Sequence, residues 1–186
     1  MTDELMTDKL PAASIEPDPE LATLLAEFDQ RGGVVDYVLL PAMPHPLAAA
    51  EFMRELERTW SFQIASDPAK AMSAPISEAR FFGRFYDRAT RRLSFCTVPF
   101  GDDEGYAYAF GSPPYGLQAT EQEASALFNA INDALFGHGA TLEIMKWSTD
   151  WSTYFAAGRA WWGSYLWTVR SSARPYVVVI GASQAE

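Results

Sequence analysis

The chain has 186 residues, 48% of them apolar and 14% aromatic, which is the length of one domain and enough to form a hydrophobic core. It has no apolar run of about 20 residues, and its acidic N-terminus lacks the apolar segment of a signal peptide. The net charge of −10 disfavours a nucleic-acid partner, and the single Cys96 excludes an intrachain disulfide, which together with the missing signal peptide predicts a cytoplasmic protein.

The N-terminal third is predicted to contain a tail, two helices and one or two strands. Residues 1–17, rich in acids and small residues, are interpreted as a flexible tail, and 18–186 as a single globular domain. Asp18 followed by Pro19 indicates the start of a helix that ends at Gly32 and Gly33. We expect a buried strand over 34–40, a second helix over about 46–58, a short strand over 60–65 and a loop over 66–77.

The middle of the chain carries the strongest β pattern. Two segments rich in aromatic and β-branched residues flank a short turn and predict a hairpin over about 80–98. The "YAYAF" segment predicts a further strand over 106–110, followed by the turn "GSPPYG".

The C-terminal third begins with the best-defined helix signal. "TEQE" forms a capping box of Thr120 and Glu123, and Gly137 ends the helix. A strand over 141–147, a short helix that begins at Asp150 and a hairpin formed by 164–170 and 176–182 complete the prediction. We therefore expect an α+β fold, with a mostly antiparallel sheet of five to seven strands and three or four helices packed mainly on one face.

The segment 150–169, "DWSTYFAAGRAWWGSYLWTV", holds four of the six Trp residues. Its first half places aromatic residues on one helical face, and after Gly163 the apolar period changes from that of a helix to that of a strand. Most of the run is therefore interpreted as core. Trp161 lies off the helical stripe, and its exposure is the open question.

Residues that bear chemistry are sparse. His45, between two prolines, is expected to be exposed, and His138 follows a helix C-terminus, where a protonated imidazole is favoured. Cys96 has no nearby ligand partner, so no metal site is predicted. There is no GxSxG elbow and no phosphate-binding loop, so we assign no catalytic residue and no cofactor.

The arginine-rich segment 80–92 could suggest single-strand nucleic-acid binding, because alternation places four side chains on one strand face: Arg80, Phe82, Arg84 and Tyr86. The acidic balance of the chain favours a different interpretation. The Arg stems cover aromatic surface, and their charges pair with the acidic N-terminal region.

These features favour a non-catalytic binding protein. We expect an immunity or antitoxin-like protein that neutralises a basic toxin, and eleven Arg against three Lys suggest a bacterial source. The predicted partner-binding residues are Asp102, Asp103 and Glu104, together with Trp161.

Two alternatives stay open. One is a small-ligand-binding protein or hydrolase-like enzyme, in which Glu143 acts as acid or base in a sheet-face pocket lined by Tyr106, Tyr108, Trp147 and Trp167. The other is a subunit of a homo-oligomer that assembles through an exposed sheet edge.

Overall fold

The computed structural model describes residues 14–60, 64–96, 104–159 and 161–183 and has an α+β fold. Seven strands are present in this part of the chain: β1 (Val35–Pro41), β2 (Ser73–Ile76), β3 (Tyr86–Asp87), β4 (Arg92–Leu93), β5 (Leu142–Trp147), β6 (Tyr165–Ser171) and β7 (Tyr176–Ala182). Five of them form one antiparallel sheet in the order β1-β7-β6-β5-β2, and β3 and β4 form a separate hairpin.

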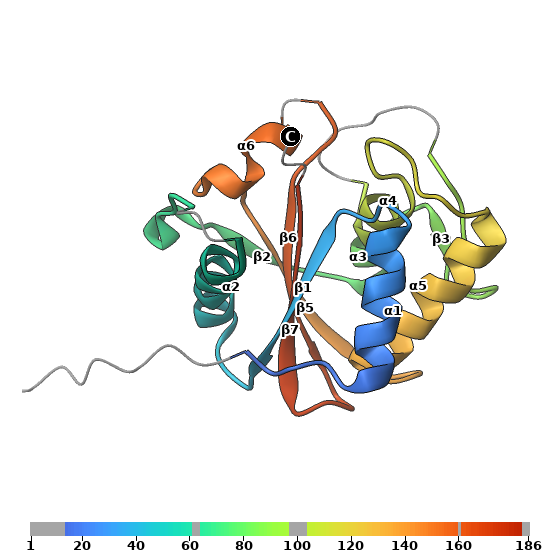
Figure 1. Ribbon diagram of the computed structural model, residues 1–186. Helices are drawn as coiled ribbons and strands as arrows, with labels where there is room; N and C mark the ends of the chain where they lie inside the picture. Colours follow the sequence, from blue (N-terminus) through green and yellow to red (C-terminus); the bar gives the residue numbers. More distant parts are fainter. Residues whose placement is uncertain (1–13, 61–63, 97–103, 160, 184–186) are drawn as a thin grey trace, which may run out of the picture.

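Helices cover both faces of the five-stranded sheet (Figure 1). The same part of the chain contains α1 (Pro19–Gln30), α2 (His45–Trp60), α3 (Glu78–Phe82), α4 (Tyr106–Gly111), α5 (Glu121–Phe136) and α6 (Ala156–Arg159), with short 3-10 turns η1 (Pro68–Lys70) and η2 (Thr153–Phe155). Four of the helices, α1, α3, α4 and α5, lie on one face, and α2 lies with η2 and α6 on the other. The expected fold class is confirmed, with more helices than the sequence indicated.

The two central strands explain this layering. In β6 the side chains of Tyr165, Trp167 and Val169 pack into the core beneath α4 and α5, whereas Leu166 packs into the core beneath α2. Because successive side chains of a strand point to opposite faces, a strand buried on both faces has to be apolar almost throughout. The run "YVVVIGA" of β7 satisfies this requirement, and Gly181 leaves room for the Phe52 ring of α2.

The predicted strand over 106–110 is wrong, because these residues form α4. All five side chains are buried, so the alternation of aromatic and alanine residues does not distinguish a solvent-exposed face from a buried one. A short, fully buried apolar run cannot be assigned to helix or strand by its periodicity. Close backbone contact between Gly83 and Gly105 then joins α3 to α4, since a Cβ at Gly105 would lie 2.9 Å from Gly83.

The predicted hairpin over 80–98 is too long. Residues up to Phe82 form α3, whose N-cap is Ser77, with its side chain accepting a hydrogen bond from the amide of Arg80. Only β3 and β4 remain as a hairpin, so the expected common strand face of Arg80, Phe82, Arg84 and Tyr86 does not exist. The short helix start at Ser77 and Glu78 outweighs the β propensity of the residues that follow.

Three smaller corrections concern segment boundaries. The predicted loop 66–77 contains the edge strand β2, in which Pro75 suits an edge position because it has no amide hydrogen. The predicted strand over 60–65 is wrong for its described part: Trp60 ends α2, and Ile64 and Ala65 have no regular structure. The helix expected from Asp150 begins later, with Ser152 as the N-cap of η2.

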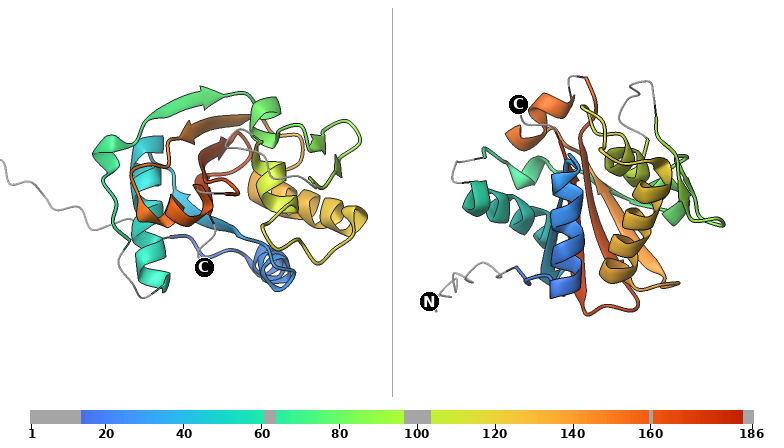
Figure 2. Two further views of the ribbon diagram at one scale, coloured as in Figure 1. Left: turned by 90° about the horizontal axis from the view of Figure 1, so that it is seen from above. Right: turned by 45° about the vertical axis from the view of Figure 1, so that its right-hand side comes forward.

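The N-terminal segment reaches the sheet within the predicted tail. The amide of Ile15 donates to the carbonyl of Leu39 at 2.7 Å, which places residues 14–17 beside β1 (Figure 2). Residues 1–13 lie outside the described residues. Across the described residues, every helix is too short or too polar to cross a membrane.

Candidate functional site

Trp161 is exposed, which answers the question that the aromatic run raised. Its side chain is 49% exposed and lies beside Tyr115, which is 80% exposed, with ring centroids 6.3 Å apart and planes inclined by 57°. Its neighbour Trp162 is buried, stacks on Tyr108 and donates from Nε1 to the carbonyl of Ser112 at 2.7 Å. The chain therefore anchors itself through Trp162 and presents the preceding residue, Trp161, to solvent.

The loop that carries Tyr115 is stiff at its base. Ser112 accepts the Trp162 hydrogen bond at its carbonyl and a second one at Oγ, from the amide of Cys96 at 2.8 Å. Pro113 and Pro114 follow directly and restrict the backbone before Tyr115. These contacts restrain the backbone that leads to Tyr115, which reduces the conformational freedom that this segment has to lose when it is buried against another molecule.

Glu104 is the described member of the predicted acidic patch, and it is neutralised within the chain. Its carboxylate lies 2.8 Å from Nε of Arg84, and the Arg84 guanidinium lies over the Phe85 ring at 5.0 Å. This contact agrees with the interpretation that arginine stems cover aromatic surface. The expected pairing with the acidic N-terminal region is wrong for Arg84, Arg88 and Arg91, whose partners are Glu104, Glu78 and Asp133. Asp102 and Asp103 lie outside the described residues.

Tyr106, Tyr108 and Trp167 lie deep in the core beneath α5. The Tyr106 hydroxyl pairs with the hydroxyl of Tyr37 at 2.7 Å, and Trp167 stacks on Tyr165 with ring centroids 5.2 Å apart. These rings fill space between the sheet and the helices.

Glu143 and Trp147 point to the opposite face of the sheet, where they join a polar network with His45 and Thr168. The Trp147 Nε1–H donates to Thr168 Oγ1 at 3.0 Å, and that oxygen lies 2.6 Å from His45 Nδ1. Glu143 lies 3.5 Å from His45 Nε2 and 3.7 Å from Arg170, and its side chain is 65% exposed. The five residues of the expected pocket are thus divided between two faces of the sheet.

The network links the tautomer of His45 to the orientation of the Thr168 hydroxyl. If Thr168 accepts from Trp147 and donates its own proton to Nδ1, the ring proton sits on Nε2 and faces the carboxylate of Glu143. Burial lowers the pKa of His45, and the charge of Arg170 acts in the same direction, while Glu143 opposes both. His45 was expected to be exposed, but it is only 7% exposed and begins α2.

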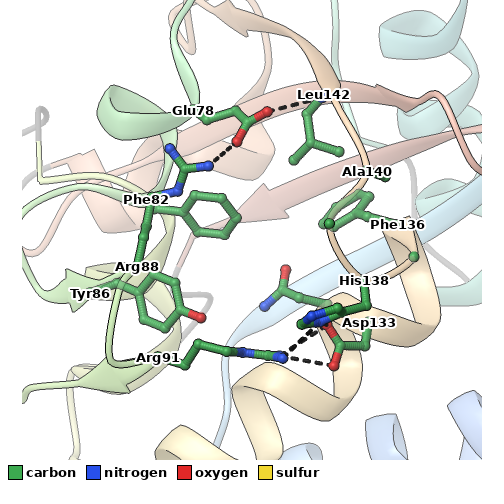
Figure 3. A pocket seen from close by; sticks show the side chains of 13 residues that line it. Glu78, Phe82, Tyr86, Arg88, Arg91, Asp133, Phe136, His138, Ala140 and Leu142 are labelled. Atoms are coloured by element: carbon green, nitrogen blue, oxygen red, sulfur yellow. Dashed lines mark hydrogen bonds and ion pairs between the residues drawn. The ribbon is translucent and has the colours of Figure 1, made fainter.

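A pocket that the sequence did not reveal lies between the β3–β4 hairpin and the C-terminal end of α5 (Figure 3). Its volume is about 210 Å³, and Phe82 and Phe136 contribute apolar wall. Arg88 pairs with Glu78 at one end of the pocket. At the other end Arg91 donates to both carboxylate oxygens of Asp133 at 2.9 Å.

Arg91 is held in an unusual conformation by several contacts. Its φ of 55° is the one positive value among the described residues other than glycine, a conformation that costs roughly 1–2 kcal/mol. Asn129 accepts from its side chain at 3.2 Å and donates to its carbonyl at 2.8 Å, and His138 Nδ1 lies 2.9 Å from its guanidinium. Because each guanidinium faces a carboxylate, the pocket suits a neutral or zwitterionic polar molecule better than a strongly charged one.

Local sequence signals could not have revealed this pocket, because Arg91 and Asp133 are 42 residues apart. Among the described residues, no group of three or more His, Cys, Asp or Glu side chains could hold a metal ion. Comparison of the chain with protein-family models, with curated proteins and with solved structures finds no match.

Proposed function

We propose that this protein is a non-catalytic binding protein of the immunity or antitoxin type, which neutralises a basic protein partner in a bacterial cytoplasm. The observation that carries the proposal is the exposed pair of Trp161 and Tyr115. Trp and Tyr dominate the residues that contribute most to protein–protein affinity, because each buries a large area with few rotatable bonds.

The position of the pair supports a binding role over a core role. Trp162 is buried and hydrogen-bonded to Ser112, so Trp161 is not needed to fill the interior. A rigid aromatic projection is the form that a binding hot spot takes when its surroundings exclude water on complex formation.

The charge of the chain supports a basic partner. A net charge of −10 accelerates association with a positively charged surface and disfavours acidic partners. Asp102 and Asp103 are the next candidates for this contact, since Glu104 already pairs with Arg84.

The alternative of a small-ligand site around Glu143 has weaker support. Glu143 is largely exposed and contacts His45 and Arg170, whereas Tyr106 and Trp167 lie on the other side of the sheet. An enzyme of this kind would need a cavity that reaches from Glu143 to those rings.

The proposal is tested by affinity capture from the source organism with tagged wild-type protein and the double variant Trp161→Ala/Tyr115→Ala. Met72→Ala is the matched control, because Met72, directly before the edge strand β2, is also a large exposed apolar residue. We expect one stoichiometric basic protein with wild type and control. The double variant should bind that purified partner roughly 10- to 100-fold more weakly.

Charge reversal provides a second measurement. Asp102→Lys/Asp103→Lys should slow association with the same partner, most strongly at low ionic strength. The free energy of unfolding of the double aromatic variant should lie within about 0.5 kcal/mol of the wild-type value. A loss of binding can then be distinguished from a loss of folding. A partner that binds the aromatic variant as tightly as wild type, or the absence of any stoichiometric partner, would overturn the proposal.

A further inference from the structure

A second cavity lies at the outer side of the edge strand β1, where Ile15 pairs with Leu39. It is bounded by residues 14–17, by β1 and by the second half of α2, and its volume is about 300 Å³. Ile15, Val38 and Leu56 supply apolar wall. This volume accommodates a group of the size of a long amino-acid side chain.

Asp36 lies in the wall of this cavity, on the face of β1 that α2 covers. Its Oδ2 accepts a hydrogen bond from the hydroxyl of Tyr154, 2.5 Å away, which comes from η2. Tyr154 is itself packed against Phe52 and Phe155, so the position of the donor is fixed. The carboxyl of Asp36 is therefore held in one orientation beside the cavity.

The cavity is acidic, and the buried carboxyl has no counter-ion among the described residues. Glu16 and Glu55 also line it, and no Lys or Arg does. Glu55 pairs with Arg58, one turn along α2. A buried carboxylate that meets only a neutral hydroxyl is costly, because carboxylates removed from water are normally paired with a cation or coordinate a metal.

We propose that this cavity binds an organic cation, a primary ammonium or a guanidinium group, with Asp36 as the anchoring carboxylate. Glu16 and Glu55 add negative charge around the cationic head, and the apolar wall contacts the aliphatic stem. This site is separate from the surface of Trp161 and does not depend on the proposed function. The same chemistry could be supplied by a free polyamine or by a Lys or Arg side chain of another protein.

The raised pKa of Asp36 gives the proposed site a second measurable property, the release of a proton on binding. Burial raises the pKa of Asp36 to about 6, Asp29 of α1 acts in the same direction, and the hydrogen bond from Tyr154 opposes both. The other charged groups that face the cavity are Glu16 and Glu55, with Arg58 beside Glu55. A bound cation stabilises the ionised form of Asp36, so binding should release a proton below about pH 6 and strengthen as the pH rises.

The experiment is titration of the full chain with cadaverine, agmatine and the blocked peptide acetyl-Gly-Arg-Gly-amide, followed by NMR shifts of the amides around Asp36 and Thr59. The uncharged 1,5-pentanediol is the control ligand for cadaverine. We expect saturable shifts with at least one cation and none with the diol. Binding of the peptide alone would identify a protein side chain as the source, and binding of a free amine would identify a small molecule.

Asp36→Asn is the deciding variant, because Asn keeps an acceptor for Tyr154 and removes the charge. It should weaken cation binding about tenfold or more and abolish the proton release. Asp150→Asn, which removes an exposed acid outside the cavity, should bind as wild type does, and Glu55→Gln should weaken binding without changing the fold. The proposal fails if no cation gives saturable shifts here, or if Asp36→Asn binds as wild type does.

Discussion

Asp36 makes the stability of the folded protein depend on pH in the opposite sense to most carboxyl groups. Its folded-state pKa of about 6 lies above the ordinary value of 3.8, because burial penalises the charged form. Between these two values the folded state binds more protons than the unfolded state. The free energy of unfolding therefore falls as the pH rises from about 4 to about 6.

We expect Asp36→Asn to remove this dependence. The variant should be more stable than wild type by roughly 2–3 kcal/mol near neutral pH, and the difference should shrink towards about pH 4, where both side chains are uncharged. Urea unfolding at several pH values measures it. If the free energies of unfolding of the two proteins changed with pH in the same way, burial would not disfavour the ionised form of Asp36 in the folded state.

His45 shows why single residues were hard to place. Two flanking prolines predicted an exposed turn, but His45 begins α2 and is covered by β5 and β6 through Thr168 and Glu143. Its partners lie about a hundred residues further along the chain. No local signal could specify contacts of that range. The departure of Trp161 from the predicted helical stripe, in contrast, was visible locally and raised the question of its exposure, which the structure answers.

At the scale of elements, the capping box of α5 is the clearest case in which sequence and structure agree. Thr120 Oγ1 accepts from the amide of Glu123 at 3.2 Å, and Glu123 accepts from the amide of Thr120 at 2.8 Å. The hydrogen bonds that the Glu123 carboxylate accepts, first from the Thr120 amide and second from the Thr120 hydroxyl, lower the pKa of Glu123. The box satisfies two amides that the helix itself leaves without acceptors.

Thr120→Ala should therefore lower the free energy of unfolding by about 1 kcal/mol. Combination with Glu123→Ala should cost less than the sum of the two single changes, because each removes the same reciprocal unit. Chemical denaturation of the wild type, the two single variants and the double variant measures the four free energies of unfolding that this comparison needs. Thr23→Ala, which removes a hydroxyl from the interior of α1, is the control and should change stability by less than about 0.5 kcal/mol. If the destabilisation of the double variant equalled the sum of the two single effects, Thr120 and Glu123 would not act as one capping box.

The short elements contrast with α5. The segments that form α3 and α4 are five and six residues long, too short for a helical apolar stripe to be distinguished from strand alternation. Their conformation follows from burial on all sides and from the contact between Gly83 and Gly105. Strong β propensity in "RFFGRFY" and "YAYAF" was overridden by tertiary packing.

At the scale of the whole molecule, β6 and β7 belong to both hydrophobic layers at once. Each strand pairs on both edges, and its side chains alternate between the core beneath α5 and the core beneath α2. If the helices on one face unfolded separately, they would expose the apolar side chains on that face of both strands. Because this exposure is unfavourable, the two cores are expected to unfold together.

We expect amide hydrogen exchange to reflect this arrangement. Backbone amides of β6 and β7 should exchange slowest, at the free energy of global unfolding, and those of the edge strand β2 should exchange faster through local opening. Exchange measured by NMR or mass spectrometry under native conditions tests the order. Protection of β2 equal to that of β7 would show that the edge has a partner in solution.

The sequence by itself determined the α+β class, the long helices α1, α2 and α5, and the C-terminal hairpin. These follow from caps, apolar periodicity and turn residues, which act between neighbours in the chain. Only the tertiary structure decided which side chains share a site, because those contacts join distant segments. Asp36 and Tyr154 are 118 residues apart, and Arg91 and Asp133 are 42 apart. Both cavities therefore depend on how the layers pack, which no local pattern encodes.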